Sequence, residues 1–340
     1  MKRLSLLFLS CILLSASCHK KGSTPANPAP TNLTLNAVVS TDNSGNVSFT
    51  ASATNAVTYD FDYGNGIFAT VPSGVVTYKY TASGTYTVNV IAKSSGGQTI
   101  SKSTTVTVTV VQSLVWSDEF DIPGAPDPAK WGYDLGAGGW GNNESQYYTN
   151  RLENASISNG TLKITAKAES FSGSNYTSAR LLSKGKYSVK YGKIEFRAKL
   201  PAGGGTWPAL WMLGDNLSSV GWPACGEIDV MEHLGNQLNK IYSTIHYPGH
   251  SGGSGVSANT MITNATTEFH IYTLEWTETQ LKFSVDGTPF FTTANNTATM
   301  PFNQNFFLIM NVAMGGNFGG AIDPAFTSGV MEVDYVRVYQ

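Results

Sequence analysis

The chain has 340 residues, 13% of them charged and 11% aromatic, with a formal net charge of −2. Average soluble domains are about 25% charged, so this low charge, together with 35 glycines, favours an all-β protein with many turns and a length of about two domains. The near-neutral charge offers no basic patch for a phosphate backbone, so nucleic acid is not expected as a partner, and a neutral polymer rich in hydroxyl groups fits better.

Residues 1–17 have the pattern of a secretory signal. Met1-Lys2-Arg3 precedes an apolar run from Leu6 to Leu14, and small residues then lead to Cys18. The run is too short to span a membrane. The pattern resembles a bacterial lipoprotein signal, in which Cys18 becomes lipidated, although Ser15 departs from it; plain secretion with cleavage nearby is the alternative. We therefore expect a cell-envelope or outer-membrane lipoprotein, surface-exposed or secreted, that meets the membrane only through a lipid at Cys18.

Residues 18–32 predict a tether, because prolines recur among polar residues without an apolar period. Residues 33–110 alternate in short runs separated by Gly, Asn and Ser, which predicts a small immunoglobulin-like β-sandwich. The segment from Tyr59 to Gly66 resembles the PKD-type module of bacterial extracellular enzymes, with Tyr59 in place of the usual Trp. We interpret this module as a spacer; binding of carbohydrate by its tyrosines is the alternative.

Residues 113–340 form the second predicted domain. Strand-like runs recur with turn signals between them, and no amphipathic pattern of three helical turns interrupts them. This pattern predicts two stacked antiparallel sheets in a jelly roll, one of them bent into a groove. The runs are Leu162–Ala168, Lys186–Val189, Lys193–Leu200, Ala209–Leu213, Ile241–His246, Ile271–Trp276, Leu281–Val285, Phe306–Val312 and Met331–Tyr339.

Three carboxylates stand in one of these strands, at Glu227, Asp229 and Glu232. Side chains alternate between the two faces of a strand, so Glu227 and Asp229 share a face and Glu232 is out of phase. A β-bulge between Asp229 and Glu232 would bring all three to one face. Their repulsion would keep at least one protonated, and an acid beside a carboxylate is the pair that cleaves glycosidic bonds. A solvated acidic strand edge is the alternative, and the pattern leaves open which acid attacks.

Eight segments together resemble glycoside hydrolase family 16, and most closely its bacterial laminarinases, which are endo-β-1,3-glucanases. The resemblance implies a concanavalin-like jelly roll whose concave sheet forms the cleft, and a retaining double displacement with no catalytic cofactor. It matches Glu227 to the nucleophile, Glu232 to the general acid/base and Asp229 to a residue that tunes their charge. The segments are Trp116–Phe120, Gly139–Glu144, Tyr176–Arg180, Leu200–Pro201, Thr206–Gly214, Gly226–Glu232, Asn311–Gly316 and Val333–Tyr339.

The same resemblance implies the residues that bind substrate. Trp140, Asn142, Asn143 and Arg180 match positions on the donor side of the cleft, with a solvated loop as the alternative for the two asparagines. His246 matches a histidine near the reaction centre, with a structural role as the alternative. Tryptophan rings bind the apolar faces of sugars. Trp207 and Trp222 adjoin prolines in turns and are expected in the cleft. For Trp211, a position in the cleft and a position in the core are equal alternatives.

The resemblance also implies a structural calcium ion on the convex side, held by Glu119, the backbone near Gly160, and Asp334, since calcium prefers oxygen ligands. Zinc is not expected, because no pair of histidines has ligand spacing with an acid. Cys225 is expected to be a small buried apolar residue and not a catalytic thiol.

The sequence thus predicts a monomeric retaining endo-glycosidase that acts on β-1,3-glucan of the laminarin type. The nearest alternatives use the same mechanism on mixed-linkage β-glucan or on a galactan such as agarose. A non-catalytic carbohydrate-binding lectin is a more distant alternative, which the presence of both glutamates disfavours, and a purely structural adhesin leaves the Trp, Asn and carboxylate residues of the second domain unexplained.

Overall fold

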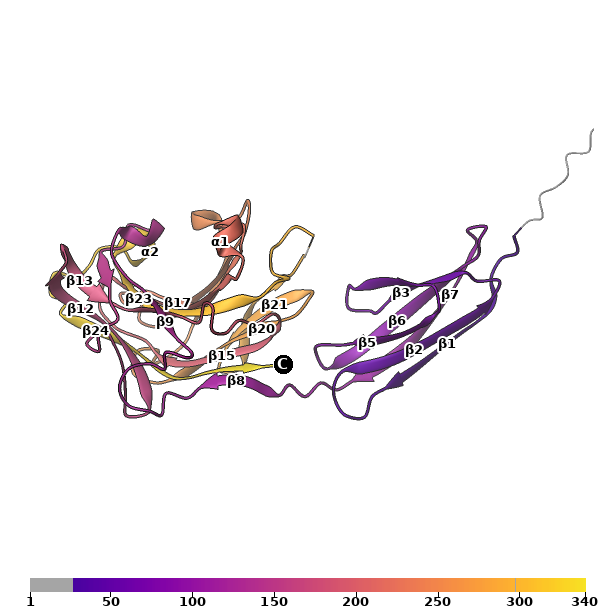
Figure 1. The fold of residues 1–340 in the computed structure, drawn as a ribbon, viewed down its shortest axis with the longest axis horizontal. Helices are drawn as coiled ribbons and strands as arrows, with labels where there is room; N and C mark the ends of the chain where they lie inside the picture. Colours follow the sequence, from indigo (N-terminus) through magenta and orange to yellow (C-terminus); the bar gives the residue numbers. More distant parts are fainter. Residues whose placement is uncertain (1–26, 297) are drawn as a thin grey trace, which may run out of the picture.

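The computed structural model describes residues 27–296 and 298–340, and the predicted signal and Cys18 lie outside them. The described chain is almost entirely β-structure, in two successive units (Figure 1). No helix in this part of the chain is long and apolar enough to cross a membrane. Within residues 27–296 and 298–340 the helical pieces are four single turns: η1 (Gly139–Gly141), α1 (Leu217–Val220), η2 (Gly252–Ser254) and α2 (Gly316–Gly319).

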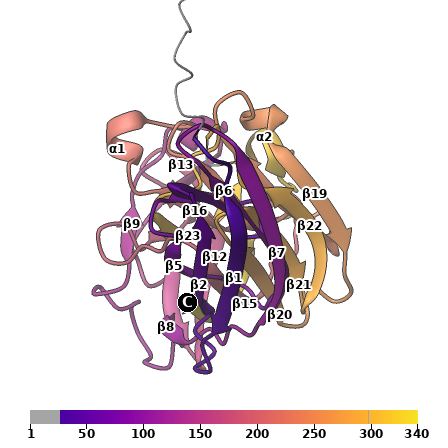
Figure 2. The same cartoon turned by 90° about the vertical axis from the view of Figure 1, so that its right-hand side faces the viewer.

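The first unit consists of a three-stranded sheet, order β1-β2-β5, and a four-stranded sheet, order β4-β3-β6-β7, which stand in the foreground of Figure 2. Alternating residues of both sheets form one apolar core. Tyr63 and Tyr80 are 1% and 0% exposed, so these two tyrosines pack in the core and cannot present a ring to a ligand. The strands are β1 (Thr31–Val39), β2 (Asn46–Thr54), β3 (Thr58–Asp62), β4 (Phe68–Val71), β5 (Val75–Lys79), β6 (Gly84–Lys93) and β7 (Thr99–Val108).

The second unit stacks a seven-stranded sheet on a ten-stranded sheet, as a jelly roll requires. The seven-stranded sheet carries the acidic strand near its middle. Its strands, in spatial order, are β19 (Val256–Met261), β18 (Lys240–His246), β17 (Glu227–His233), β16 (Thr206–Gly214), β23 (Phe306–Met314), β14 (Arg180–Leu182) and β9 (Gly132–Asp134).

The ten-stranded sheet lies on the opposite side of the core and contains both the first and the last strand of this unit. Strand β8 pairs with β24, and the main chains of Ser113 and Gln340 exchange hydrogen bonds of 2.8 and 3.0 Å. The strands are β10 (Gln146–Tyr148), β13 (Ser174–Ser178), β12 (Thr161–Phe171), β24 (Ser328–Tyr339), β15 (Gly192–Lys199), β20 (His270–Trp276), β21 (Gln280–Val285) and β22 (Thr288–Ala294) in order, with β11 (Ala155–Ser158) on β12 and β8 (Leu114–Asp118) on β24.

One predicted boundary and one predicted strand need correction. Strand β1 begins at Thr31, so the tether ends two residues earlier than its predicted limit. The predicted strand Lys186–Val189 is wrong: the amides of Lys186 and Tyr187 both donate to the carbonyl of Ser183, and only Val189 bridges to another strand. Gly185 explains the difference, because its φ of 71° bends the chain in a way that other residues resist.

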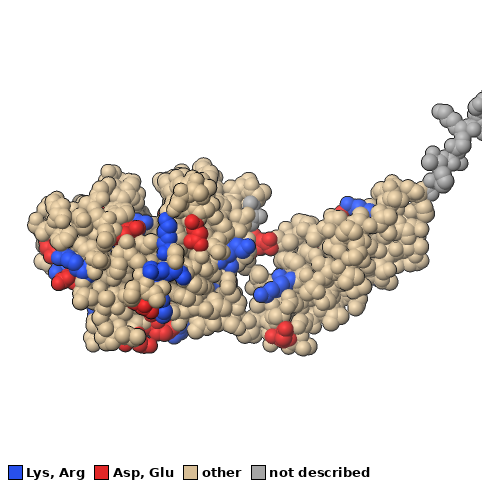
Figure 3. Space-filling model, viewed as in Figure 1, with Lys and Arg blue, Asp and Glu red and all other residues tan. Residues whose placement is uncertain are grey.

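Alternation decides which side chains of the seven-stranded sheet enter the core. Leu210, Met212, Ile228 and Met231 pack between the two sheets and are fully buried. The paired residues Trp211 and Asp229 point to the open face of the sheet, which curves away from the core (Figure 1). Figure 3 shows a notch on this side of the unit, between the lobes that carry α2 and α1. The open face therefore forms the floor of a groove.

Candidate active site

Strand β17 contains the predicted bulge. On one side Leu210 pairs with Met231 and Trp211 pairs with Asp229; on the other, Asp229 pairs with Thr244 and Glu232 with Tyr242. Val230 is thus the extra residue. Because directly paired residues point to the same side of a sheet, Glu227, Asp229 and Glu232 all face the groove. The bulge prediction is confirmed.

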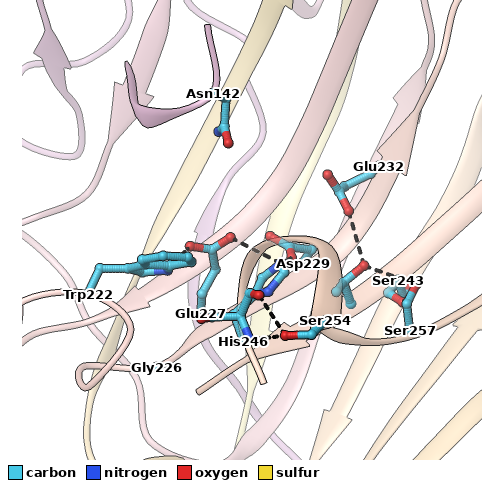
Figure 4. A network of polar contacts seen from close by, with 12 residues as sticks. Asn142, Trp222, Gly226, Glu227, Asp229, Glu232, Ser243, His246, Ser254 and Ser257 are labelled. Carbon is cyan, nitrogen blue, oxygen red and sulfur yellow. Dashed lines mark hydrogen bonds and ion pairs between the residues drawn. The ribbon is translucent and has the colours of Figure 1, made fainter. Parts of the chain in front are cut away.

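Glu227 lies between an exposed tryptophan and a histidine (Figure 4). The indole Nε1 of Trp222 donates to its Oε2 at 2.7 Å. The Nε2 of His246 lies 3.7 Å from its Oε1 and 3.4 Å from Oδ2 of Asp229. This contact follows from the register, which places His246 directly opposite Glu227. Trp222, His246 and Glu227, predicted from separate segments, are therefore in contact.

Glu232 is held by a second set of donors. The indole Nε1 of Trp207 donates to its Oε1 at 3.0 Å, and the hydroxyl of Thr244 lies 3.1 Å from its Oε2. The Trp207 ring meets Phe318 edge to face, with the ring centroids 5.5 Å apart. Each glutamate thus has its own tryptophan donor, from β16 for Glu232 and from the turn before β17 for Glu227.

All three acids are protonated more readily than ordinary carboxyls. Burial raises the pKa of Glu227 well above its usual value, and the charge of Asp229 raises it further, while His246 and the Trp222 donor act in the opposite direction. Burial and the charge of Glu232 raise the pKa of Asp229 well above its usual value. Burial also raises the pKa of Glu232 against its two donors. The predicted mixture of protonated and ionised acids fits this arrangement.

Arg180 connects the aromatic residues on the other side of the acids. Its guanidinium lies 4.6 Å from the ring centre of Trp211 and 5.2 Å from that of Trp140, and its Nε lies 3.0 Å from Asp134. Such contacts are cation–π interactions. Trp211 is half-buried and pairs with Asp229, so the two side chains lie on the same, groove-facing side of the sheet.

The loop that contains Asn142 and Asn143 adjoins this region. A side chain placed on Gly316 would lie 2.8 Å from the carbonyl of Asn142 and 3.5 Å from the ring of Trp207, so the loop and the tryptophan are neighbours. Asn143 donates to Asn317 at 2.8 Å and is exposed. Asn142 therefore lies near the acids, whereas the side chain of Asn143 ties this loop to α2.

Three residues of the site were not predicted. Thr244 contacts Glu232, Asn311 accepts the Trp211 indole at 2.7 Å, and Glu144 accepts from Gln146 and Tyr148 at 2.6 and 3.1 Å. Thr244 could have been found, because it is two residues from His246 in one strand and so shares its face. Glu144 ends the segment Gly139–Glu144, and burial raises its pKa.

The residues expected at the calcium site lie in or beside the ten-stranded sheet. Glu119 accepts two hydrogen bonds from Arg337, at 3.1 and 2.8 Å, and Asp334 accepts one from Arg197 at 2.6 Å. Gly160 lies in the turn between β11 and β12. Because arginines engage both carboxylates, these side chains do not fit a carboxylate-lined calcium site. Cys225 is fully buried beside Leu213 and Phe307, as predicted.

Comparison with known families places most of the second unit in one of them. The sequence profile described as Glycosyl hydrolases family 16 matches residues 142–337. A second profile, described as Beta-glucan synthesis-associated protein SKN1/KRE6/Sbg1, matches residues 50–228 and so ends before Asp229 and Glu232. Only the first profile spans the complete acidic strand.

Similar proteins and structures agree with this match. A beta-glucanase of Rhodothermus marinus is 46% identical over 242 residues, covering 67% of this chain and 85% of its own length. Glucan endo-1,3-beta-glucosidase A1 of Niallia circulans is 39% identical over 67% of this chain, which spans only 38% of that protein. The crystal structure of the R. marinus laminarinase superposes with a TM-score of 0.65 at 46% identity, covering 68% of this chain and 98% of that one.

Proposed function

Because the chain belongs to glycoside hydrolase family 16, whose members are retaining endo-glycosidases, we propose that its substrate is β-1,3-glucan of the laminarin type. The observation that supports hydrolysis by a pair of glutamates is the bulged strand β17, which aims both glutamates at one groove with a tryptophan donor on each. The relatives described as a laminarinase and as a glucan endo-1,3-beta-glucosidase support the choice of glucan.

The reaction divides into two displacements. In the first, Glu227 attacks the anomeric carbon as the carboxyl of Glu232 gives its proton to the leaving glycosidic oxygen. In the second, the carboxylate of Glu232 takes a proton from water, and that water displaces Glu227 from the glycosyl-enzyme intermediate. Each step inverts the anomeric carbon, so the product retains the original configuration.

Asp229 keeps the two glutamates in their required states. It is 3% exposed, and its Oδ2 has no hydrogen-bond donor, so its ionised form is the least well solvated of the three. Burial and the neighbouring Glu232 hold its pKa well above the usual value. A neutral Asp229 spares Glu227 an adjacent negative charge, which favours the ionised nucleophile, while the raised pKa of Glu232 keeps that group available as an acid.

The test is hydrolysis of soluble laminarin by Glu227→Gln. The substitution keeps the shape of the side chain and removes the nucleophile, so we expect turnover below about a thousandth of wild type, with an unchanged far-UV circular dichroism spectrum. Turnover above that level would refute the role of Glu227. Product analysis on laminarin, mixed-linkage glucan and agarose tests the substrate, and a preference for agarose would overturn the glucan assignment while leaving the mechanism intact.

A calcium ion near Gly160 would have to be held without the two predicted carboxylates. Since arginines hold the carboxylates of Glu119 and Asp334, an ion near Gly160 would need main-chain carbonyl oxygens as its principal ligands. A melting temperature that rises with added calcium and falls with a chelator would support such an ion. Equal melting temperatures under both conditions would exclude a stabilising role.

The envelope location and the spacer role also belong to the proposal. The signal pattern at residues 1–17 supports lipidation of Cys18. Incorporation of radiolabelled palmitate by wild type, compared with Cys18→Ser, tests it.

The separate apolar core of residues 31–108 supports a PKD-like module that holds the second unit away from a membrane. Light scattering during size-exclusion chromatography tests the expected monomer.

A further inference from the structure

The catalytic centre contains a set of atoms that suits a transition-metal ion. Among the residues that the structure describes, one group of three acids or histidines can bring ligand atoms within 4.8 Å of one another: Glu227, Asp229 and His246. A search for paired histidines in the sequence could not find this set, because it combines one imidazole with two carboxylates from two strands. Imidazole and carboxylate together suit zinc and copper better than calcium.

The two distances from His246 are near those of a tetrahedral ion. Zinc binds imidazole nitrogen and carboxylate oxygen at about 2.0–2.2 Å, so two ligand atoms on a tetrahedron lie about 3.4 Å apart. Nε2 of His246 is 3.4 Å from Oδ2 of Asp229 and 3.7 Å from Oε1 of Glu227. The oxygens of Glu227 and Asp229 lie within 4.8 Å of each other, and a rotation of Glu227, which borders the groove, would adjust this distance. The fourth position would face the groove and take a water molecule.

The required lone pairs are available. Trp222 donates to Oε2 of Glu227, and Oε1 faces Nε2 of His246 at 3.7 Å. Oδ2 of Asp229 belongs to a residue that is 3% exposed, and it has no hydrogen-bond partner. It is aimed at Nε2 of His246 (Figure 4). A buried carboxylate oxygen without a donor beside a second carboxylate is stabilised by a cation.

We propose that Zn²⁺ binds to Glu227, Asp229 and His246 and inhibits the enzyme reversibly. The ion would occupy the carboxylate that attacks the anomeric carbon, so zinc and glycan would compete for the same centre. Nδ1 of His246 is buried and has no partner, so the Nδ1–H tautomer needed for zinc lacks the usual outer hydrogen bond, which limits affinity. The inhibitory consequence rests on the proposed function; the binding itself does not.

The binding test uses zinc chloride and the whole chain. Isothermal titration should show one site per chain, and His246→Gln and Asp229→Asn should each weaken it about a hundredfold or more, because even outer partners of a metal site contribute about 10–100-fold. Glu232→Gln, on the same strand but outside the set, and His250→Gln should keep the site. Cobalt should give the visible absorption of a tetrahedral ion in wild type and lose it in His246→Gln. No binding, or equal binding by His246→Gln, would overturn the proposal.

The activity test uses soluble laminarin. Zinc should raise KM and leave kcat unchanged, and a chelator should restore the rate. If laminarin is not hydrolysed, the proposed substrate fails while titration and cobalt absorption still decide the zinc site. If laminarin is hydrolysed and zinc lowers kcat without changing KM, the competitive site proposed here is wrong.

Discussion

The indole Nε1 of Trp222 donates to Oε2 of Glu227 at 2.7 Å, although Trp222 lies in a turn and is 47% exposed. The donor favours the ionised carboxyl and so opposes the effect of burial on the pKa of Glu227. Trp207 makes the equivalent bond to Glu232. The two bonds should therefore control opposite ends of the pH profile.

Trp222→Phe should raise the pKa of Glu227, because the N–H donor is lost while an aromatic ring remains at this position. The attacking group must be ionised, so the acidic limb of the kcat/KM profile should move to higher pH. A hydrogen bond to a charged group contributes about 1.5–3 kcal/mol when buried and less at this exposed site, so we expect about a tenfold loss of kcat/KM near neutral pH. An unmoved acidic limb would show that this donor does not act on the nucleophile.

Trp207→Phe is the matched experiment on the acid. Loss of its N–H donor should raise the pKa of Glu232, which must be protonated in the first step, so the basic limb should move to higher pH and the acidic limb should stay in place. The profiles of the two variants should thus shift at opposite ends. The same limb moving in both would mean that the roles of Glu227 and Glu232 are not separated as proposed.

Gly255→Ala should disturb His246 without straining the backbone. The φ of Gly255 is −54°, which alanine adopts easily, but the added Cβ would lie 2.5 Å from Cε1 and 2.6 Å from Nδ1 of His246. The imidazole must therefore shift, and we expect a loss of kcat of up to about a hundredfold. Gly253→Ala, with no atom within 4 Å of its added Cβ, is the control. Equal kcat for the two variants would show that the position of His246 is unimportant.

Asp229→Asn should stabilise the protein at neutral pH. The folded pKa of Asp229 lies above its unfolded value of about 3.9, so wild type loses stability as pH rises from about 4 toward the folded pKa. Asparagine cannot ionise, so the variant does not lose this stability. Its melting temperature should be about 2–4 °C above that of wild type at pH 7 for each 1 kcal/mol of unfolding free energy retained, and equal to wild type near pH 4. Exposed Asp121→Asn serves as the control. A difference that persists at pH 4 would need another cause.

The spacing of the acids in one strand predicted the bulge. Glu232 is an odd number of residues from Glu227, so in a regular strand the two would face opposite sides of the sheet. The partners of each acid were harder to predict. His246 meets Glu227 only because of the register between β17 and β18, and Trp207 meets Glu232 because Trp207 and the bulge lie on adjacent strands. Register depends on the whole sheet and not on local sequence. The strand predicted at Lys186–Val189 failed for the opposite reason, since the local turn at Gly185 outweighed an apolar alternation.

Strand β24 follows every other strand in sequence, yet it lies between β12 and β15 and also pairs with β8. During synthesis, the halves of the ten-stranded sheet must therefore wait with unpaired edges until β24 leaves the ribosome. Pairings across such long sequence separations form slowly and leave the chain open to aggregation. The first unit pairs only strands within residues 31–108 and can fold earlier. We expect folding yield in a cell to depend on chaperones that protect the second unit through this interval.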